Sequence, residues 1–151
     1  MRKKIIRGIL LVLLAAFVII QFFRFDKSNP PIDAQQDYYT LAQPPAEVAQ
    51  LLEAACNDCH SHATKYPWYT NIAPVSWWIQ GHIDNGREEL NFSEIASYPQ
   101  GKFSHKMEEC AEMLREKEMP LLSYMIMHND AWLSDEERER MAVFFEALSQ
   151  R

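Results

Sequence analysis

The sequence lacks the alternating runs of apolar and polar residues that would build a sheet. It also lacks internal repeats and low-complexity tracts. With 151 residues, the chain has room for one modest domain plus accessory segments. These absences argue against a β-rich or repetitive architecture, and we expect an all-α fold.

Positive charge is scarce beyond the first 27 residues. The whole chain has a formal net charge of −6. Residues 1–27 contain six lysines and arginines against Asp26, a balance of +5, which leaves −11 for residues 28–151. Such an acidic domain repels phosphate backbones, so we expect no nucleic-acid partner. Redox partner proteins with basic patches are favoured instead.

Residues 1–27 are predicted to be a signal-anchor with a single N-terminal transmembrane helix. Basic residues come first, and the run from Ile9 to Ile20 is apolar on every face. From Ile5 to Phe23 the segment has 19 residues, near the roughly 20 that span a bilayer. The positive-inside rule leaves the N-terminus in the cytoplasm. We therefore expect a single-pass protein of the bacterial inner membrane, with its domain on the periplasmic side.

A cleaved signal peptide is the alternative for this segment, although no clear small-x-small cleavage site follows the apolar run. Residues 28–44 are predicted to be a linker, because two Pro-Pro pairs with Gln, Asp and Ser between them are poor material for helices and strands. The domain is then expected over residues 45–151.

Helical periodicity begins after the linker. Four helices are predicted, over residues 46–55, 77–90, 104–117 and from Ser134 to Leu148. A capping box from Ser134 to Glu137 opens the last of them. Apolar stripes expected to be buried are Val48, Leu51, Leu52 and Ala55, then Met107, Cys110, Ala111 and Leu114, and finally Met141, Phe144, Phe145 and Leu148.

Cysteine use is the most informative feature. Two of the three cysteines belong to the run Cys56-Asn57-Asp58-Cys59-His60, which is typical of covalent haem attachment. One helical turn presents both thiols to neighbouring vinyl groups of the macrocycle, where each forms a thioether. The next residue, His60, then projects toward the iron as proximal ligand. We expect one covalent haem c.

Two other interpretations of this run stay open. A thioredoxin-like redox pair would need a βαβ setting, and the chain lacks strands. A zinc site would need His60, His62 or His82 to complete it. No second C-x-x-C pair exists, and Cys110 stands alone.

Met119 is the first candidate for the distal iron ligand. It follows a predicted helix, directly before Pro120. A thioether is soft, suits Fe(II) and raises the reduction potential relative to a second imidazole. His128 and His82 are alternative distal ligands, and an open or water-bound position is a further alternative. Met119 could alternatively be an ordinary core methionine without a role at the iron.

Weaker indications concern the walls of the site. Trp68 and Trp77 are candidates to pack against the macrocycle, with plain core packing as the alternative. Arg87 and Lys65 are candidate partners for haem propionates. Three further side chains are expected to have no direct part, namely the surface histidines His62 and His105 and the buried thiol of Cys110.

Several stretches resemble known haem proteins. The helix that runs into the Cys56–His60 motif, the Met119-Pro120 pair and the capped final helix resemble class I cytochromes c. More closely, residues 45–150 resemble the bacterial haem-binding domain family, often found as small membrane-anchored proteins. The matching stretches are Cys56 to Ser61, Tyr66 to Tyr69, Ile72 to Trp78, His82, Gly86-Arg87, Leu90 to Ser93, Glu118 to Leu121, Tyr124 and His128. The resemblance implies covalent haem c in a small cytochrome c-like helical domain, and it implies no substrate or partner.

These observations together favour a membrane-anchored monohaem c-type cytochrome that shuttles single electrons outside the cytoplasm. One alternative is a peroxidase-like haem enzyme with an open sixth iron position, where His82 or His128 acts as a distal acid–base group. Another is a haem or gas sensor in which a ligand displaces Met119. The last is a structural zinc domain.

Overall fold

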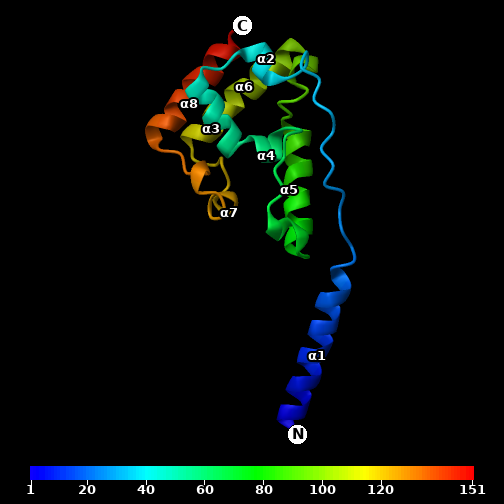
Figure 1. The fold of residues 1–151 in the computed structure, drawn as a ribbon. Helices are drawn as coiled ribbons and strands as arrows, with labels where there is room; N and C mark the ends of the chain where they lie inside the picture. Colours follow the sequence, from blue (N-terminus) through cyan, green and yellow to red (C-terminus); the bar gives the residue numbers. More distant parts are fainter.

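The computed structural model describes residues 1–151 and consists of helices joined by loops, without a strand (Figure 1). The all-α prediction is confirmed, and the helix predicted over residues 46–55 has those bounds. The α-helices are α1 (Arg2–Ile20), α2 (Tyr38–Ala42), α3 (Ala46–Ala55), α4 (Asn57–His60), α5 (Val75–Glu89), α6 (Gln100–Arg115), α7 (Leu122–Met125) and α8 (Asp135–Ser149). Short 3₁₀ helices lie at Trp68–Asn71, Ile95–Ser97 and Asn129–Ala131.

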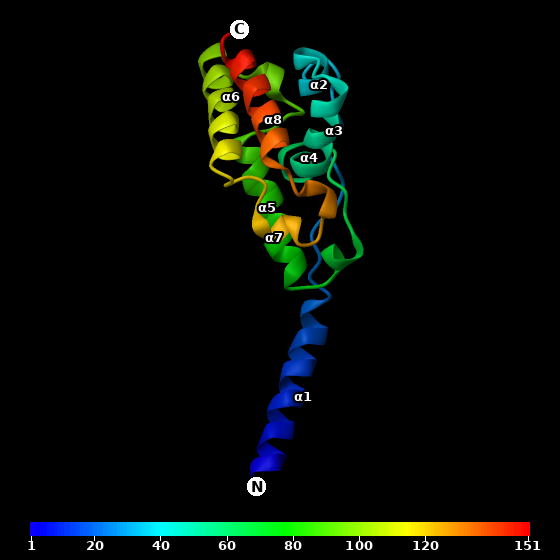
Figure 2. The same cartoon turned by 90° about the vertical axis from the view of Figure 1, so that its left-hand side faces the viewer.

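The main core lies where α3, α6 and α8 meet, at the end of the molecule far from α1 (Figures 1 and 2). In each predicted apolar stripe, three of the four residues are buried. The fourth members are Leu51, Cys110 and Phe144, which pack partly buried against the same core. Burial of one large apolar side chain contributes about 1.5–3 kcal/mol, so these stripes hold the three helices together.

The predicted capping box at the start of α8 is confirmed. The Ser134 hydroxyl accepts a hydrogen bond from the Glu137 amide at 3.2 Å, and the Glu137 carboxylate accepts one from the Ser134 amide at 2.8 Å. Two amides of the first turn are thereby satisfied. The cap starts α8 at Asp135 and so sets which of its residues face α6.

Close packing of α5 against α4 depends on Gly86. A Cβ atom at this position would lie 2.7 Å from the carbonyl oxygen of Cys59 and 3.2 Å from its Cβ. Real Cβ atoms do not approach backbone oxygens this closely, so only glycine permits the contact. The approach places the last turns of α5 directly beside the Cys56–His60 run.

Helix α1 projects away from the rest of the chain, and none of its residues is buried (Figures 1 and 2). It has 19 residues, and four cations (Arg2, Lys3, Lys4 and Arg7) occupy its first two turns. No helix of the structure combines the length and the apolar character needed to cross a bilayer. The prediction of a single transmembrane helix in residues 1–27 is therefore not supported, because the cations shorten the apolar stretch.

The segment expected to be a linker, residues 28–44, packs onto the domain. Tyr38, at the start of α2, has 0% exposure and belongs to the main core. Its amide donates to the Phe92 carbonyl at 2.8 Å, and the Asn29 side chain donates to the Thr64 carbonyl at 2.9 Å. The packed part of the chain thus begins before residue 45.

Candidate haem site

The two cysteines of the motif lie on one tight turn between α3 and α4. Cys56 closes α3 through its amide, which donates to the Leu52 carbonyl at 2.9 Å, and its own carbonyl accepts from the His60 amide at 3.0 Å. Both thiols are free and half-buried. Burial raises the pKa of Cys56 to about 12 and that of Cys59 to about 11. The structure therefore presents two protonated thiols three residues apart on one turn of the chain.

The ring of His60 is oriented by α5. Its Nδ1 lies 2.9 Å from the Gly86 carbonyl oxygen and 3.1 Å from that of Leu90. Carbonyl oxygens only accept, so Nδ1 carries the proton and the lone pair is on Nε2. Burial lowers the pKa of His60 and keeps the imidazole neutral. A neutral ring with Nδ1–H bonded to a backbone carbonyl is the form in which histidine ligates a metal through Nε2.

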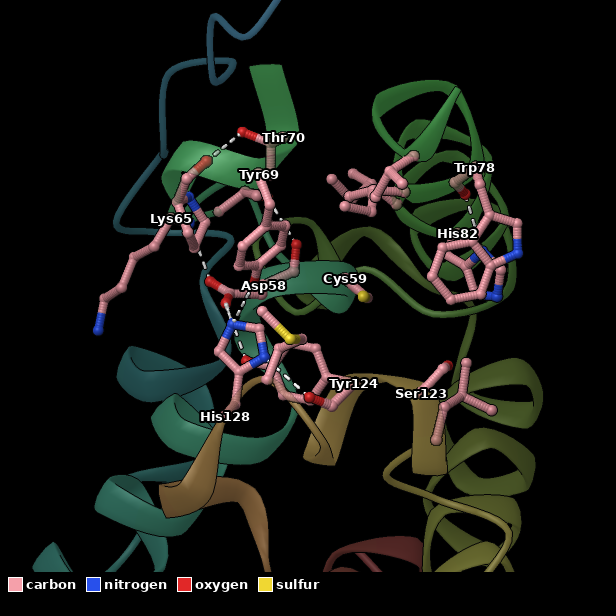
Figure 3. A pocket seen from close by; sticks show the side chains of 17 residues that line it. Asp58, Cys59, Lys65, Tyr69, Thr70, Trp78, His82, Ser123, Tyr124 and His128 are labelled. Atoms are coloured by element: carbon pink, nitrogen blue, oxygen red, sulfur yellow. Dashed lines mark hydrogen bonds and ion pairs between the residues drawn. The ribbon is translucent and has the colours of Figure 1, made fainter. Parts of the chain in front are cut away.

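Apolar cavities flank the motif on both sides. The first, of about 260 Å³, is lined by Cys56, His60 and Met119 among others. The second, of about 300 Å³, is lined by Cys59, Trp78, His82, Tyr124 and further side chains. In Figure 3 the Cys59 thiol points into the second cavity, between the His82–Trp78 pair and Tyr124. The motif therefore borders apolar space on either side of α4.

Met119 lies in the loop between α6 and α7 and lines the same cavity as the proximal candidate His60. The loop is hydrogen-bonded to the end of α6, since the amides of Glu118 and Met119 reach the Met113 carbonyl at 3.0 and 3.3 Å. The structure thus brings together His60 and Met119, which lie far apart in the sequence.

His128 has both ring nitrogens engaged. Its Nδ1 lies 2.9 Å from the Tyr124 carbonyl oxygen, and its Nε2 lies 3.0 Å from the Tyr69 hydroxyl. The ring also stacks on that of Tyr124, whose hydroxyl donates to the Asp58 carboxylate at 2.8 Å (Figure 3). With no lone pair available, His128 serves this polar network and is not presented as an iron ligand.

His82 differs from His128 in this respect. Its Nδ1 donates to the Trp78 carbonyl one helical turn earlier, at 2.9 Å, which leaves the Nε2 lone pair unengaged. The residue lines the second cavity together with Cys59, whereas His60 lines the first. His82 therefore borders the candidate site but lines a different cavity from His60.

A model of the haem-binding domain family matches residues 15–147. The chain belongs to this family. Comparisons with curated proteins and with solved structures find no match. The family match begins within α1 and includes the whole packed segment before α3, in agreement with the burial of Tyr38. The chain is thus a haem-binding protein, and its donor set of two adjacent thiols and one neutral imidazole fits that cofactor.

The tryptophans expected to pack on the macrocycle lie elsewhere. Trp68 is 71% exposed and Trp77 is 41% exposed, and neither lines either cavity. The indole N–H of Trp77 donates to the Phe23 carbonyl at 2.7 Å, so this side chain fastens the segment after α1 to α5. Trp78, the next residue, lines the second cavity instead. The one-residue difference follows from the helical rotation of about 100° per residue.

The cations expected near the haem site are placed in two ways. Arg87 donates to the Ser61 carbonyl at 2.9 Å and to the Thr64 hydroxyl at 2.9 Å, so it braces the loop after the motif. Lys65 is exposed and lines the second cavity. Lys106, which the sequence did not single out, lines the first cavity.

The remaining candidates are placed as follows. The predicted surface position of His62 is wrong, because this side chain is buried and bonds to the Asn91 amide at 2.9 Å. His105 is exposed, as predicted. Cys110 is half-buried against the core and lines the first cavity, and burial raises its pKa.

The zinc and thioredoxin-like interpretations of the motif find no support. No group of three or more His, Cys, Asp and Glu side chains is arranged to hold a metal ion. The βαβ setting of a thioredoxin-like pair is absent as well, since the chain has no strand. Family membership indicates haem as the ligand of this chain.

Proposed function

We propose that this haem-binding domain holds one haem c covalently and transfers single electrons outside the cytoplasm. The observation that carries the proposal is the state of His60. Its Nδ1–H is bonded to the Gly86 carbonyl, and its Nε2 is left free one residue after two adjacent thiols. Cys56 and Cys59 would each form a thioether with one vinyl group.

Met119, which lines the same cavity as His60, would supply a second ligand to the iron. When bound, the haem supplies a one-electron Fe(III)/Fe(II) couple whose potential a thioether ligand raises. The chain's own residues hold the ligands and exclude water. Leu90, Phe92 and Leu114 form part of this apolar wall, which lowers the local dielectric and so raises the cost of the ferric charge.

Acidic side chains at the first cavity suit a basic redox partner. Glu89 and Glu109 line it, with Lys106 between them as their ion-pair partner. With a formal balance of −11 over residues 28–151, the domain would attract a positively charged surface, with a rate that falls as salt is added.

The location outside the cytoplasm belongs to the same proposal. Helix α1 exposes apolar side chains along its whole length and has no buried residue. We propose that it attaches the domain to the bacterial inner membrane from the periplasmic side, with its cationic end at the lipid headgroups. Membrane fractions that lose the protein on deletion of residues 2–20 would support the attachment, and unchanged fractionation would refute it.

An enzyme or sensor with a labile sixth iron position is the second candidate. The unengaged Nε2 of His82 favours it, because this atom borders the second cavity without a partner. Rapid peroxide turnover that is lost in His82→Ala would establish this function in place of electron transfer. Reversible one-electron titration without peroxide turnover would support the leading proposal.

Covalent attachment is tested by mass spectrometry and by the pyridine haemochrome spectrum of the full-length holoprotein. We expect the mass of one haem on the wild-type chain and a haemochrome of c type. The paired variants are Cys56→Ala, Cys59→Ala and the control Cys110→Ala, whose thiol lines the first cavity outside the motif. Each motif variant should lose one of the two thioethers, while the Cys110→Ala control should keep both thioethers. Haem that is released by acidified acetone from the wild-type protein would contradict the proposal.

A further inference from the structure

Arg138 is a buried cation near the start of α8 whose partners are backbone carbonyls. It is 6% exposed and takes part in none of the ion pairs of the structure. Its Nη1 donates to the Met119 carbonyl oxygen at 2.6 Å and to that of Leu114 at 3.3 Å. A guanidinium is strongly unfavourable inside a protein unless it is hydrogen-bonded, so these two bonds give Arg138 a defined location.

Both carbonyls belong to the structure that presents Met119. Leu114 lies in the last turn of α6, where carbonyl groups lack helical partners and a positive charge is favourable. After α6 the chain reverses at Lys117, which has a φ of 61° in the left-handed region. One side chain of α8 therefore connects the end of α6 to the loop that follows it.

The backbone of Met119 is held on both sides as a result. Its amide donates to the Met113 carbonyl at 3.3 Å, and its carbonyl accepts from Arg138. With both peptide groups fixed, the side chain leaves the loop toward the cavity that His60 lines. The capping box at Ser134 sets the start of α8, and thereby the direction from which Arg138 approaches.

We propose that Arg138 is the positioning residue that keeps Met119 on the iron, an inference that rests on the proposed ligation by Met119. A thioether is a weak ligand, so the fraction of bound ligand depends on how well the protein preorganises the loop. Without the guanidinium, the Met119 carbonyl loses its charge-assisted partner and the loop gains other conformations. A purely structural role would lower stability without changing the iron ligands.

The test compares Arg138→Met and Arg138→Lys with Arg115→Met in the full-length holoprotein. Arg115 is a matched control, because it also joins α6 to α8, through Glu139 and Glu146 at the surface. The readouts are the far-red Met-to-Fe(III) band, the reduction potential and the affinity of the ferric protein for added imidazole. Met119→Ala defines the spectrum without the thioether.

We expect Arg138→Met to lose most of the far-red band, to lower the potential and to bind imidazole at least about tenfold more tightly. Arg138→Lys should fall between this variant and the wild type, since an ammonium reaches one carbonyl at a time. The control should match the wild type in all three readouts. If Arg138→Met does not accumulate, Arg138→Lys decides the question.

A full far-red band and unchanged imidazole affinity in Arg138→Lys would overturn the inference, as would the same losses in Arg115→Met. A wild-type protein with covalent haem but no far-red band would remove Met119 as ligand and the inference with it, while haem attachment stands. A wild-type protein without covalent haem would overturn the proposed function itself and this inference together.

Discussion

The contact between Gly86 and the turn at Cys59 allows a direct comparison of two variants within one helix. Gly81 and Gly86 both lie inside α5. A Cβ at Gly81 would meet nothing within 4 Å, whereas a Cβ at Gly86 would lie 2.7 Å from the Cys59 carbonyl oxygen. Gly81→Ala therefore reports helix propensity alone, and Gly86→Ala reports propensity plus the contact.

The magnitudes follow from these two situations. Replacing a helical glycine by alanine stabilises by about 1 kcal/mol, which is the expected gain for Gly81→Ala. The same gain applies at Gly86, but overpacking against backbone atoms costs about 1–3 kcal/mol or more. Gly86→Ala should therefore be less stable than Gly81→Ala by the overpacking cost of about 1–3 kcal/mol. For a chain of this size, each kcal/mol shifts Tm by about 2–4 °C.

A second effect is expected at the haem. The Gly86 carbonyl accepts hydrogen bonds from the Leu90 amide and from Nδ1 of His60, both at 2.9 Å. If α5 moves to relieve the clash, the His60 ring loses its fixed orientation. We therefore expect a perturbed ferric spectrum or lower haem occupancy in Gly86→Ala and neither change in Gly81→Ala.

Thermal unfolding of the holoprotein, followed by far-UV circular dichroism, measures the first effect, and optical spectra measure the second. Equal Tm values and identical spectra for the two variants would refute the reasoning, because they would mean that α5 does not closely contact the turn at Cys59. A loss of stability in Gly81→Ala as large as in Gly86→Ala would show that the helix itself, and not the contact, is sensitive.

Three further outcomes are expected from other parts of the structure. Met119→Ala should abolish the far-red Met-to-Fe(III) band and lower the reduction potential in optical redox titrations, and an unchanged spectrum would exclude Met119 as ligand. The hydroxyl of Tyr38 is buried without a partner, so Tyr38→Phe should be neutral or stabilising, whereas Tyr38→Ala should cost about 3–5 kcal/mol in chemical denaturation; equal losses would mean that the hydroxyl is bonded in the holoprotein. Ser134→Ala should lower the free energy of unfolding by about 1 kcal/mol. The control Ser149→Ala, at the other end of α8, removes no N-terminal cap and should cost less. The Ser134 backbone amide and hydroxyl hold the pKa of the Glu137 carboxylate below its usual value. The part of the Ser134→Ala deficit that comes from the bond between the hydroxyl and the carboxylate is therefore present above the ordinary carboxyl pKa and is lost as pH falls through the lowered one; a deficit of the same size on both sides of this range would argue against that bond.

Local features of this protein were predictable because their physics is local. The bounds of α3 follow from a block of helix formers, and the capping box at Ser134 from two residues three apart. The thiol pair and His60 are neighbours in the sequence, so one turn of backbone brings them together. None of these depends on how distant segments pack.

Features that join distant segments were missed or placed differently. Tyr38 was assigned to a linker, yet it is in the main core, because its partners Phe92 and Phe145 come from other parts of the chain. His62 was assigned to the surface, but the loop from Asn91 covers it. Composition and periodicity do not encode such partners.

The Cys56–His60 run by itself predicted a haem-attachment turn with His60 as the proximal ligand, since one helical turn contains all the atoms concerned, and the family match shows that the chain binds haem. Only the tertiary structure decided which nitrogen of His60 is free and which residues share its cavity. The reason is that the Gly86 carbonyl of α5 orients the His60 ring, and Arg138 of α8 holds the loop that contains Met119. Each arises from contacts between residues that are 19 to 30 positions apart in the chain.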